Sequence, residues 1–150
     1  MRDSIKAQFE VLDERFRSCG GDGWMERLHT GCRWTEGPAY FPAGRYLVFS
    51  DIPNDRILRW DETTGAVGVF RQPAGYANGH TDDRNGRLVS CEQDGLHCFD
   101  PDGTLIGKLH VPEVVANFTF GGTKRNRLFI CASSSLYSIL VNFNGARYPR

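Results

Sequence analysis

Short apolar runs alternate with polar, glycine-bearing turns over most of the chain. The runs are four to six residues long and read YLVFS, RILRW, AVGVF, LVSC, LHCF, TLIGKL, LFICA and LYSIL. Several turns between them end in Asp-Gly or Asn-Gly, as at Gly103 and Gly145. These dipeptides supply the positive φ angles that tight hairpins require. The pattern therefore predicts an all-β protein made of short antiparallel strands.

The apolar runs recur in three units with a period of about 40 residues. In each unit the turn that leads into the second run ends in an arginine: Gly44-Arg45, Gly86-Arg87 and Asn126-Arg127. Four short strands per period are typical of a β-propeller blade. We expect one domain over residues 1–150, a truncated propeller with about three four-stranded blades near 36–75, 78–115 and 117–145. A β-sandwich also has short strands and many turns, but it does not predict three aligned units.

The N-terminal segment gives two different signals. Ile5, Phe9, Leu12 and Phe16 fall at the spacing of a helix, whereas the later stretch WMERLHTG is typical of a strand. The third unit lacks an apolar run after Asn144-Gly145. We therefore expect residues 1–32 to help close the last blade by supplying that strand.

Three polar residues take equivalent positions when the units are aligned on their arginines. Glu36, Asn78 and Asn117 each precede the first strand of a unit, which in a propeller lines the central channel. One carboxylate and two carboxamides offer the hard oxygen ligands that Ca²⁺, Mg²⁺ and Mn²⁺ prefer. Asparagine also caps turns by itself, so a turn role stays open for Asn78 and Asn117. His80, which closely follows Asn78, is a further candidate for lining the channel or contacting a substrate.

Composition and charge exclude several classes of function. The chain has 18 basic and 18 acidic residues and no basic stripe, so nucleic acid is not an expected partner. No apolar stretch approaches the roughly 18 residues of a membrane span. The five cysteines are odd in number and show no zinc-ligand spacing, and the N-terminus lacks the apolar segment of a signal peptide. Buried free thiols in the cytoplasm are the expectation.

Motifs of other enzyme classes are incomplete. The serine run at 133–135 lacks the G-x-S-x-G elbow that exposes a nucleophilic serine. The DPDG stretch at 100–103 lacks the spacing and the final glutamate of an EF-hand, so a hairpin turn explains it. A serine hydrolase and an EF-hand protein are therefore not expected.

Four stretches resemble the gluconolactonase/regucalcin (senescence marker protein)/luciferin-regenerating family, and bacterial gluconolactonases most. They read FEVLDERFR, GCRWTEGPAYFPAGRYLVFSDIPNDRILRWDETTG, YANGHTDDRNGRLVSCE and VPEVVANFTFGGTKRNRLFICASSSLYSILVNFNGA. The resemblance implies a six-bladed β-propeller that hydrolyses sugar lactones. It also implies a divalent cation in the channel, usually Ca²⁺, with Mg²⁺, Mn²⁺ or Zn²⁺ as alternatives. The acid of the E-G-P motif is a metal ligand in this family, and Glu36 stands at that position.

The sequence departs from the family in its length and in its middle. Family members are about twice as long, and here RLVSCEQ of an early blade runs into DGLHCFDPDG of a late one. We therefore expect the middle blades to be deleted, with the junction near Gln93-Asp94. In the family those blades carry the remaining metal ligands and much of the substrate contact, and no residue here matches them. The catalytic general base is accordingly not assigned, and Asp82 and Asp83, both expected in a turn, are the nearby acids after Asn78.

Two functions follow as expectations. The first is a sugar-lactone hydrolase that uses metal-assisted ester hydrolysis and is impaired by the missing blades. The second is a non-catalytic metal-binding or protein-interaction remnant of such a propeller. Three blades cannot close a ring, so a homodimer that completes six blades is an expected partner, besides a sugar lactone.

Overall fold

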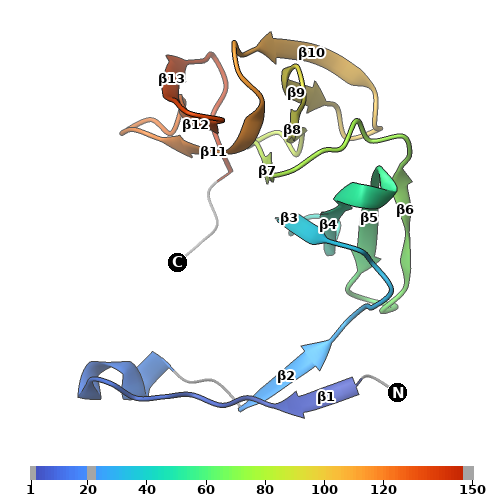
Figure 1. Cartoon of the computed structure of the whole chain (residues 1–150), viewed down its shortest axis with the longest axis vertical. Coiled ribbons are helices and arrows are strands. Elements are labelled where there is room, and N and C mark those ends of the chain that lie inside the picture. Colours follow the sequence, from blue (N-terminus) through green and yellow to red (C-terminus); the bar gives the residue numbers. More distant parts are fainter. Residues whose placement is uncertain (1–2, 20–22, 147–150) are drawn as a thin grey trace. The chain divides into compact units, whose positions relative to one another are not determined.

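The computed structural model describes residues 3–19 and 23–146 (Figure 1). The chain forms two compact units. Unit 1 lies within residues 1–31 and unit 2 within residues 32–150. No helix in the described ranges is long and apolar enough to cross a membrane.

Unit 1 contains a strand pair and one short helix. Its elements are β1 (Asp3–Lys6), the 3-10 helix η1 (Glu14–Cys19) and β2 (Trp24–Arg27). β2 confirms the strand expected in WMERLHTG. A continuous helix from Ile5 is wrong, because Ile5 lies in β1 and pairs with Met25. Helical structure begins only after Asp13, whose carboxylate accepts a hydrogen bond from the amide of Arg15 at 2.9 Å, a local bond that favours a turn.

Unit 2 consists of three antiparallel sheets whose strands follow one another in chain order. The first sheet contains β3 (Thr35–Phe41), β4 (Tyr46–Asp51), β5 (Arg56–Asp61) and β6 (Val67–Arg71), with the 3-10 turn η2 (Ile52–Asn54) between β4 and β5. The second contains β7 (His80–Asp82), β8 (Leu88–Glu92), β9 (Gly95–Phe99) and β10 (Leu105–His110). The third contains β11 (Val115–Gly121), β12 (Arg127–Ala132) and β13 (Leu136–Leu140). The predicted short strands are all present, which confirms the all-β class.

The third sheet has three strands among the described residues, and β13 forms one of its edges. The closing role expected for residues 1–32 therefore stays a prediction.

The first strands of the three sheets lie next to one another, so that β3 contacts β7 and β7 contacts β11 (Figure 1). Two glycines make this approach possible. A Cβ atom on Gly37 would lie far inside contact distance of the backbone oxygen of Asn78, and one on Gly79 would lie 2.5 Å from Oδ1 of Asn117. A larger side chain at Gly37 would clash with the backbone of Asn78 and force these strands apart, whereas one at Gly79 would first displace the side chain of Asn117.

The hydrophobic core forms two layers, one on each side of the second sheet. The first layer contains Ala39, Phe41, Val48, Ile57, Ala74, Ala77, Leu88 and Phe99. The second contains Val89, Cys91, Leu96, Val115, Phe118, Phe120, Leu128 and Ile130. Along β8, Leu88 belongs to the first layer and Val89 to the second, because successive side chains of a strand point to opposite faces. The second sheet is thus covered on both faces.

Asp51 ties the segment before β3 to the link between β4 and β5. Its fully buried carboxylate accepts hydrogen bonds from the amide of Arg33 (3.0 Å), the side-chain amide of Asn54 (2.8 Å) and the guanidinium of Arg56 (2.9 Å). Burial alone would raise the pKa of Asp51, but these donors outweigh it and hold the pKa well below its usual value. The charged carboxylate therefore positions the chain just ahead of Glu36.

A buried polar pair links the first sheet to the second. Oγ of Ser50 lies 2.8 Å from Nε2 of His80 and donates to the backbone oxygen of Asn78 at 3.1 Å. Both side chains are buried. Burial, assisted by the positive charge of Arg71, lowers the pKa of His80 to about 3, so the imidazole is neutral at pH 7.

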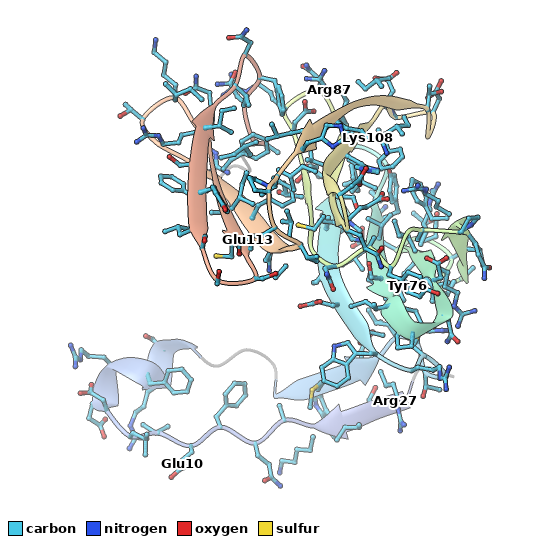
Figure 2. The ribbon with its side chains drawn as sticks, turned by 45° about the horizontal axis from the view of Figure 1, so that its top comes forward. Glu10, Arg27, Tyr76, Arg87, Lys108 and Glu113 are labelled. Atoms are coloured by element: carbon cyan, nitrogen blue, oxygen red, sulfur yellow. The ribbon has the colours of Figure 1, made fainter. Side chains whose placement is uncertain are left out.

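Glu113, labelled in Figure 2, fixes the turn between β12 and β13. Its carboxylate accepts hydrogen bonds from the amide and hydroxyl of Ser134 and from the hydroxyls of Ser135 and Tyr137. The serine run that lacked a nucleophile motif therefore serves to anchor this turn.

Four cysteines have described side chains, and all four are free thiols. Cys91 is buried, Cys32 and Cys98 are half-buried, and Cys131 is exposed. The prediction of buried thiols thus holds for Cys91 and is wrong for Cys131, which lies on the uncovered face of the third sheet. The side chain of Cys19 lies outside the described part of the structure.

Replacing Asp51 with Asn should destabilise unit 2 strongly. The charge that pairs with Arg56 is lost while the guanidinium stays partly buried, and breaking such a pair costs about 3 kcal/mol. Urea unfolding measures the change, with Asp102→Asn in an exposed turn as the matched control. Equal midpoints for Asp51→Asn and the control would contradict the anchoring role.

Stability should fall as pH decreases below the ordinary pKa of histidine. Between pH 6.5 and about 3 the unfolded chain binds a proton at His80 that the folded chain does not bind, so the folded state loses stability on acidification. One such proton contributes a slope that approaches about 1.4 kcal/mol per pH unit. His80→Asn should show a shallower dependence than wild type in urea unfolding at several pH values. His110→Asn, at an exposed histidine, controls for the loss of an imidazole, and identical slopes for wild type and His80→Asn would refute the argument.

Candidate functional site

The strand register places Glu36, Asn78 and Asn117 at equivalent positions of the three sheets. Glu36 pairs with Ser50 on β4, and Asn117 pairs with Cys131 on β12. The amide of Asn78 donates to the backbone oxygen of Cys91 on β8 at 3.0 Å. The backbone pairing therefore agrees with the sequence alignment, which gave the three polar residues equivalent positions in their units.

The arginine used to align the first unit is shifted by one residue. Arg45 lies in the turn before β4 with φ at 50°, and Tyr46 begins the strand. In the second unit Gly86 has the positive φ angle and Arg87 follows it. Arg45 thus corresponds to Gly86 rather than to Arg87, a difference that only the backbone conformation reveals.

The three polar residues are linked in pairs by close approaches of the chain at the glycines that follow two of them. Gly37, which follows Glu36, contacts the backbone of Asn78, and Gly79, which follows Asn78, contacts the side chain of Asn117. Sequence reasoning missed the role of these two glycines, although each one directly follows a candidate residue. We call Glu36, Asn78 and Asn117 the inner row.

The inner row offers one carboxylate and two carboxamide groups. Glu36 is half-buried and Asn117 is exposed. Oδ1 of Asn117 accepts a hydrogen bond from the backbone amide of Phe118 at 2.8 Å. The side-chain nitrogen Nδ2 of Asn78 donates to the backbone oxygen of Val115 at 3.4 Å. These bonds fix both side chains and leave an oxygen lone pair of each for a ligand.

The thiol beside the inner row is not a thiolate. The pKa of Cys91 is raised to about 12, mainly by burial and to a smaller extent by the negative charge of Glu36. A protonated thiol is a poor metal ligand, so the donor set is one of hard oxygens. In the described part of the chain, no three His, Cys, Asp or Glu side chains are close enough together to hold a metal ion. A cation at the inner row would therefore rely on Glu36, amide oxygens and water.

His80 has a different environment from the other candidates. Its side chain is only 7% exposed and packs between the first and second sheets. The backbone oxygen of Asn78 can only accept, so the hydroxyl of Ser50 donates to it, and a His80 protonated at Nε2 would donate to Ser50 in turn. The two side chains thus form a buried polar link between the first and second sheets.

The acids that follow Asn78 are engaged elsewhere. Asp83 lies in the turn after β7, where its carboxylate binds the guanidinium of Arg87 at 2.6 Å. Asp82 was expected in the same turn but is the last residue of β7 and is buried. Neither is placed as an open general base.

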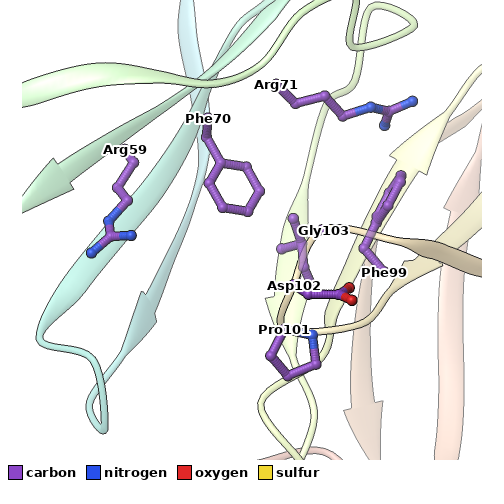
Figure 3. A pocket seen from close by; sticks show the side chains of 8 residues that line it. Arg59, Phe70, Arg71, Phe99, Pro101, Asp102 and Gly103 are labelled. Atoms are coloured by element: carbon purple, nitrogen blue, oxygen red, sulfur yellow. The ribbon is translucent and has the colours of Figure 1, made fainter.

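A cavity of about 290 Å³ lies between β5–β6 and β8–β9, lined in part by Arg59 and Arg71 (Figure 3). Arg71 stacks on Phe99 and pairs with Glu92, and Arg59 stacks on Tyr46. Both guanidinium groups are thus held by aromatic rings, and carboxylates compensate their charge, with Asp61 lying 3.5 Å from Arg59. Asp102 also lines the cavity, and its carboxylate accepts a hydrogen bond from the amide of Thr104 at 2.8 Å.

A family model described as SMP-30/gluconolactonase/LRE-like region matches residues 34–99 and 78–134. The two matches overlap and together reach from the start of the first sheet into the third. They cover more than half of the chain.

Two curated relatives are lactonases by name. A gluconolactonase from Zymomonas mobilis subsp. mobilis is 34% identical over 53 residues, which cover 35% of this chain and 15% of the relative. A pentonolactonase from Haloferax volcanii is 28% identical over 120 residues, which cover 73% of this chain and 41% of the relative. The chain thus spans less than half the length of either relative.

Solved structures share the fold. A gluconolactonase from Xanthomonas campestris superposes with a TM-score of 0.72 at 24% identity, covering 88% of this chain and 48% of that one. Regucalcin from Agrobacterium tumefaciens is described as a calcium-binding protein. It superposes with a TM-score of 0.70 at 19% identity, and the match covers 83% of this chain and 51% of regucalcin. At these identities the likeness shows the fold alone, and it confirms sheets of the β-propeller type. By its sequence matches and its fold, the chain belongs to the SMP-30/gluconolactonase/LRE-like family.

Proposed function

We propose that the protein acts in the hydrolysis of a sugar lactone, with a divalent cation bound at the inner row. Family membership supports this proposal, as do the names of the two curated relatives, gluconolactonase and pentonolactonase. The chain spans less than half of each relative, so the activity of the full-length relatives is extended to it only as a proposal.

The observation that carries the proposal is the position of Glu36. It directly precedes Gly37, the glycine that brings β3 against Asn78, and it lies near a thiol that stays protonated. A half-buried carboxylate beside two amide oxygens suits Ca²⁺, with Mg²⁺ and Mn²⁺ next. Zn²⁺ fits less well, because the described residues bring no histidine or thiolate to this set.

A bound cation would polarise the lactone carbonyl and lower the pKa of an attacking water. The residues of this chain would hold and orient the ligands. Glu36 supplies the negative charge, and Asn78 and Asn117 supply neutral oxygens that can also contact sugar hydroxyls. His80 contributes by holding Ser50 and the backbone of Asn78 in place.

A second candidate function is a metal-binding protein without catalysis. The engagement of Asp83 with Arg87 and the burial of Asp82 favour it, because lactone hydrolysis gains from a free general base near the metal. The two functions differ in turnover rather than in metal affinity.

The cytoplasm is the proposed compartment. The odd number of cysteines and the free state of the four described thiols are typical of proteins in a reducing environment.

Calcium should raise the melting temperature in a manner that depends on Glu36. At a free concentration of 100 times the dissociation constant, a ligand of the folded state stabilises it by about 2.7 kcal/mol. Glu36→Gln should weaken binding at least tenfold, because the only charged ligand of the row is lost. Differential scanning fluorimetry with a Ca²⁺ titration measures this, with Asp102→Asn as the control. An equal shift for wild type and Glu36→Gln would contradict a metal site at the inner row.

Hydrolysis of glucono-δ-lactone or a pentonolactone should require the added cation. Proton release at constant pH reports opening of the ester, and Ca²⁺, Mg²⁺, Mn²⁺ and Zn²⁺ are tested in parallel after chelation. We expect activity with wild type and a loss of at least tenfold in Glu36→Gln. Calcium-dependent stabilisation without turnover on any of these lactones would reject the hydrolase and support the second candidate function.

A further inference from the structure

The third sheet has one buried and one uncovered face among the described residues. Phe118, Leu128 and Ile130 face the second sheet. The opposite face carries Leu136 and Leu140, whose side chains are 70% and 64% exposed. We call the face formed by Phe129, Cys131, Leu136, Ser138 and Leu140 the open face.

The open face repeats a surface that another sheet covers elsewhere in the chain. In the second sheet Cys91 pairs with Leu96 and Val89 pairs with Cys98. In the third sheet Cys131 pairs with Leu136 and Phe129 pairs with Ser138, in the same register. The second-sheet surface is buried against the third sheet. The open face is therefore shaped to receive one more sheet of the same kind.

The matching surface is found on the first sheet. Towards the second sheet it presents Val48 and Ile57, so Leu47, Leu58 and Trp60 point to its other face. Leu47 and Trp60 pair with each other, and both are apolar. This face corresponds to the one with which the third sheet contacts the second, since Leu47 and Leu128 take equivalent places in β4 and β12.

The three described sheets of unit 2 cannot bring these two faces together, because the faces lie at opposite ends of the array and closed propellers have at least about four blades. The chain covers 48% and 51% of the length of two solved relatives with the same fold. Two copies therefore supply about as many sheets as one relative.

We propose that two copies of this chain associate about a two-fold axis, with the open face of each third sheet packed on the first sheet of the other copy. A heterologous contact of this kind, made twice, closes after two copies rather than growing into a filament. The inference follows from the packing of the sheets and does not require lactone hydrolysis.

The dimer has a consequence for the inner row that does rest on the proposed function. β3, β7 and β11 of both copies would border one central space. The row of each copy would then face that of its partner, so the carboxylate of Glu36 would occur twice there. A cation site that is short of charged ligands in one chain would gain a second carboxylate.

Light scattering after size-exclusion chromatography of the full chain tests the proposal. We expect twice the 16.9 kDa mass of one chain at micromolar concentration. The double variant Leu136→Asp/Leu140→Asp places charges on the open face and should halve the mass. Leu105→Asp/Ile106→Asp, on the exposed side chains of β10, is the matched control and should stay dimeric. Far-ultraviolet circular dichroism verifies that each variant keeps its strands.

Trp60→Asp identifies the surface that receives the open face. It should also halve the mass, because Trp60 belongs to the first sheet. A dimer that survives Trp60→Asp but not the open-face variant would mean that two third sheets pair with each other, and it would overturn the proposal. A wild-type monomer would do the same. Mass is measured without substrate, so absence of lactone hydrolysis in an intact dimer would count against the proposed function alone.

Discussion

The close approach of β3, β7 and β11 at Gly37 and Gly79 is the constraint on which the rest of unit 2 depends. It brings the first strands of three sheets within contact, and it does so directly after Glu36 and Asn78. The sheets spread outwards from this line, and the two core layers fill the space between them. Asp51 and the Ser50–His80 pair then fix the first sheet to its surroundings with buried hydrogen bonds.

The repeated sheet structure explains why the second sheet is buried on both faces and why the third sheet has one exposed face. Each sheet has two apolar faces because alternate residues of its strands point in opposite directions. The second sheet has a neighbour on each side, so β8 is buried throughout. The third sheet repeats the same alternation, but the described residues of unit 2 cover only one of its faces, which leaves leucines of β13 exposed. Such a face is unfavourable in a monomer and favourable in an interface.

The chemistry of the inner row is set by oxygen atoms. Glu36 provides the charge, the two asparagines provide neutral donors, and the adjacent Cys91 thiol stays protonated. These features are the ones on which the proposed cation site rests. Asp83 is paired with Arg87 and Asp82 is buried, so the presence of a general base, rather than the metal preference, decides between the two candidate functions.

The strands, their turns and the equivalence of Glu36, Asn78 and Asn117 could be predicted from the sequence, because hydrophobic alternation and glycine turns are local signals that repeat. The family resemblance rested on equally local motifs. Three features needed the tertiary structure. Arg45 is displaced by one residue because the turn places it at positive φ, which its residue type does not announce. His80 is buried and neutral because two sheets meet over it, and Cys131 is exposed because no sheet of the described chain covers its face. A sequence repeat shows that each sheet has apolar faces. Only the tertiary structure shows which of these faces are buried against a neighbouring sheet.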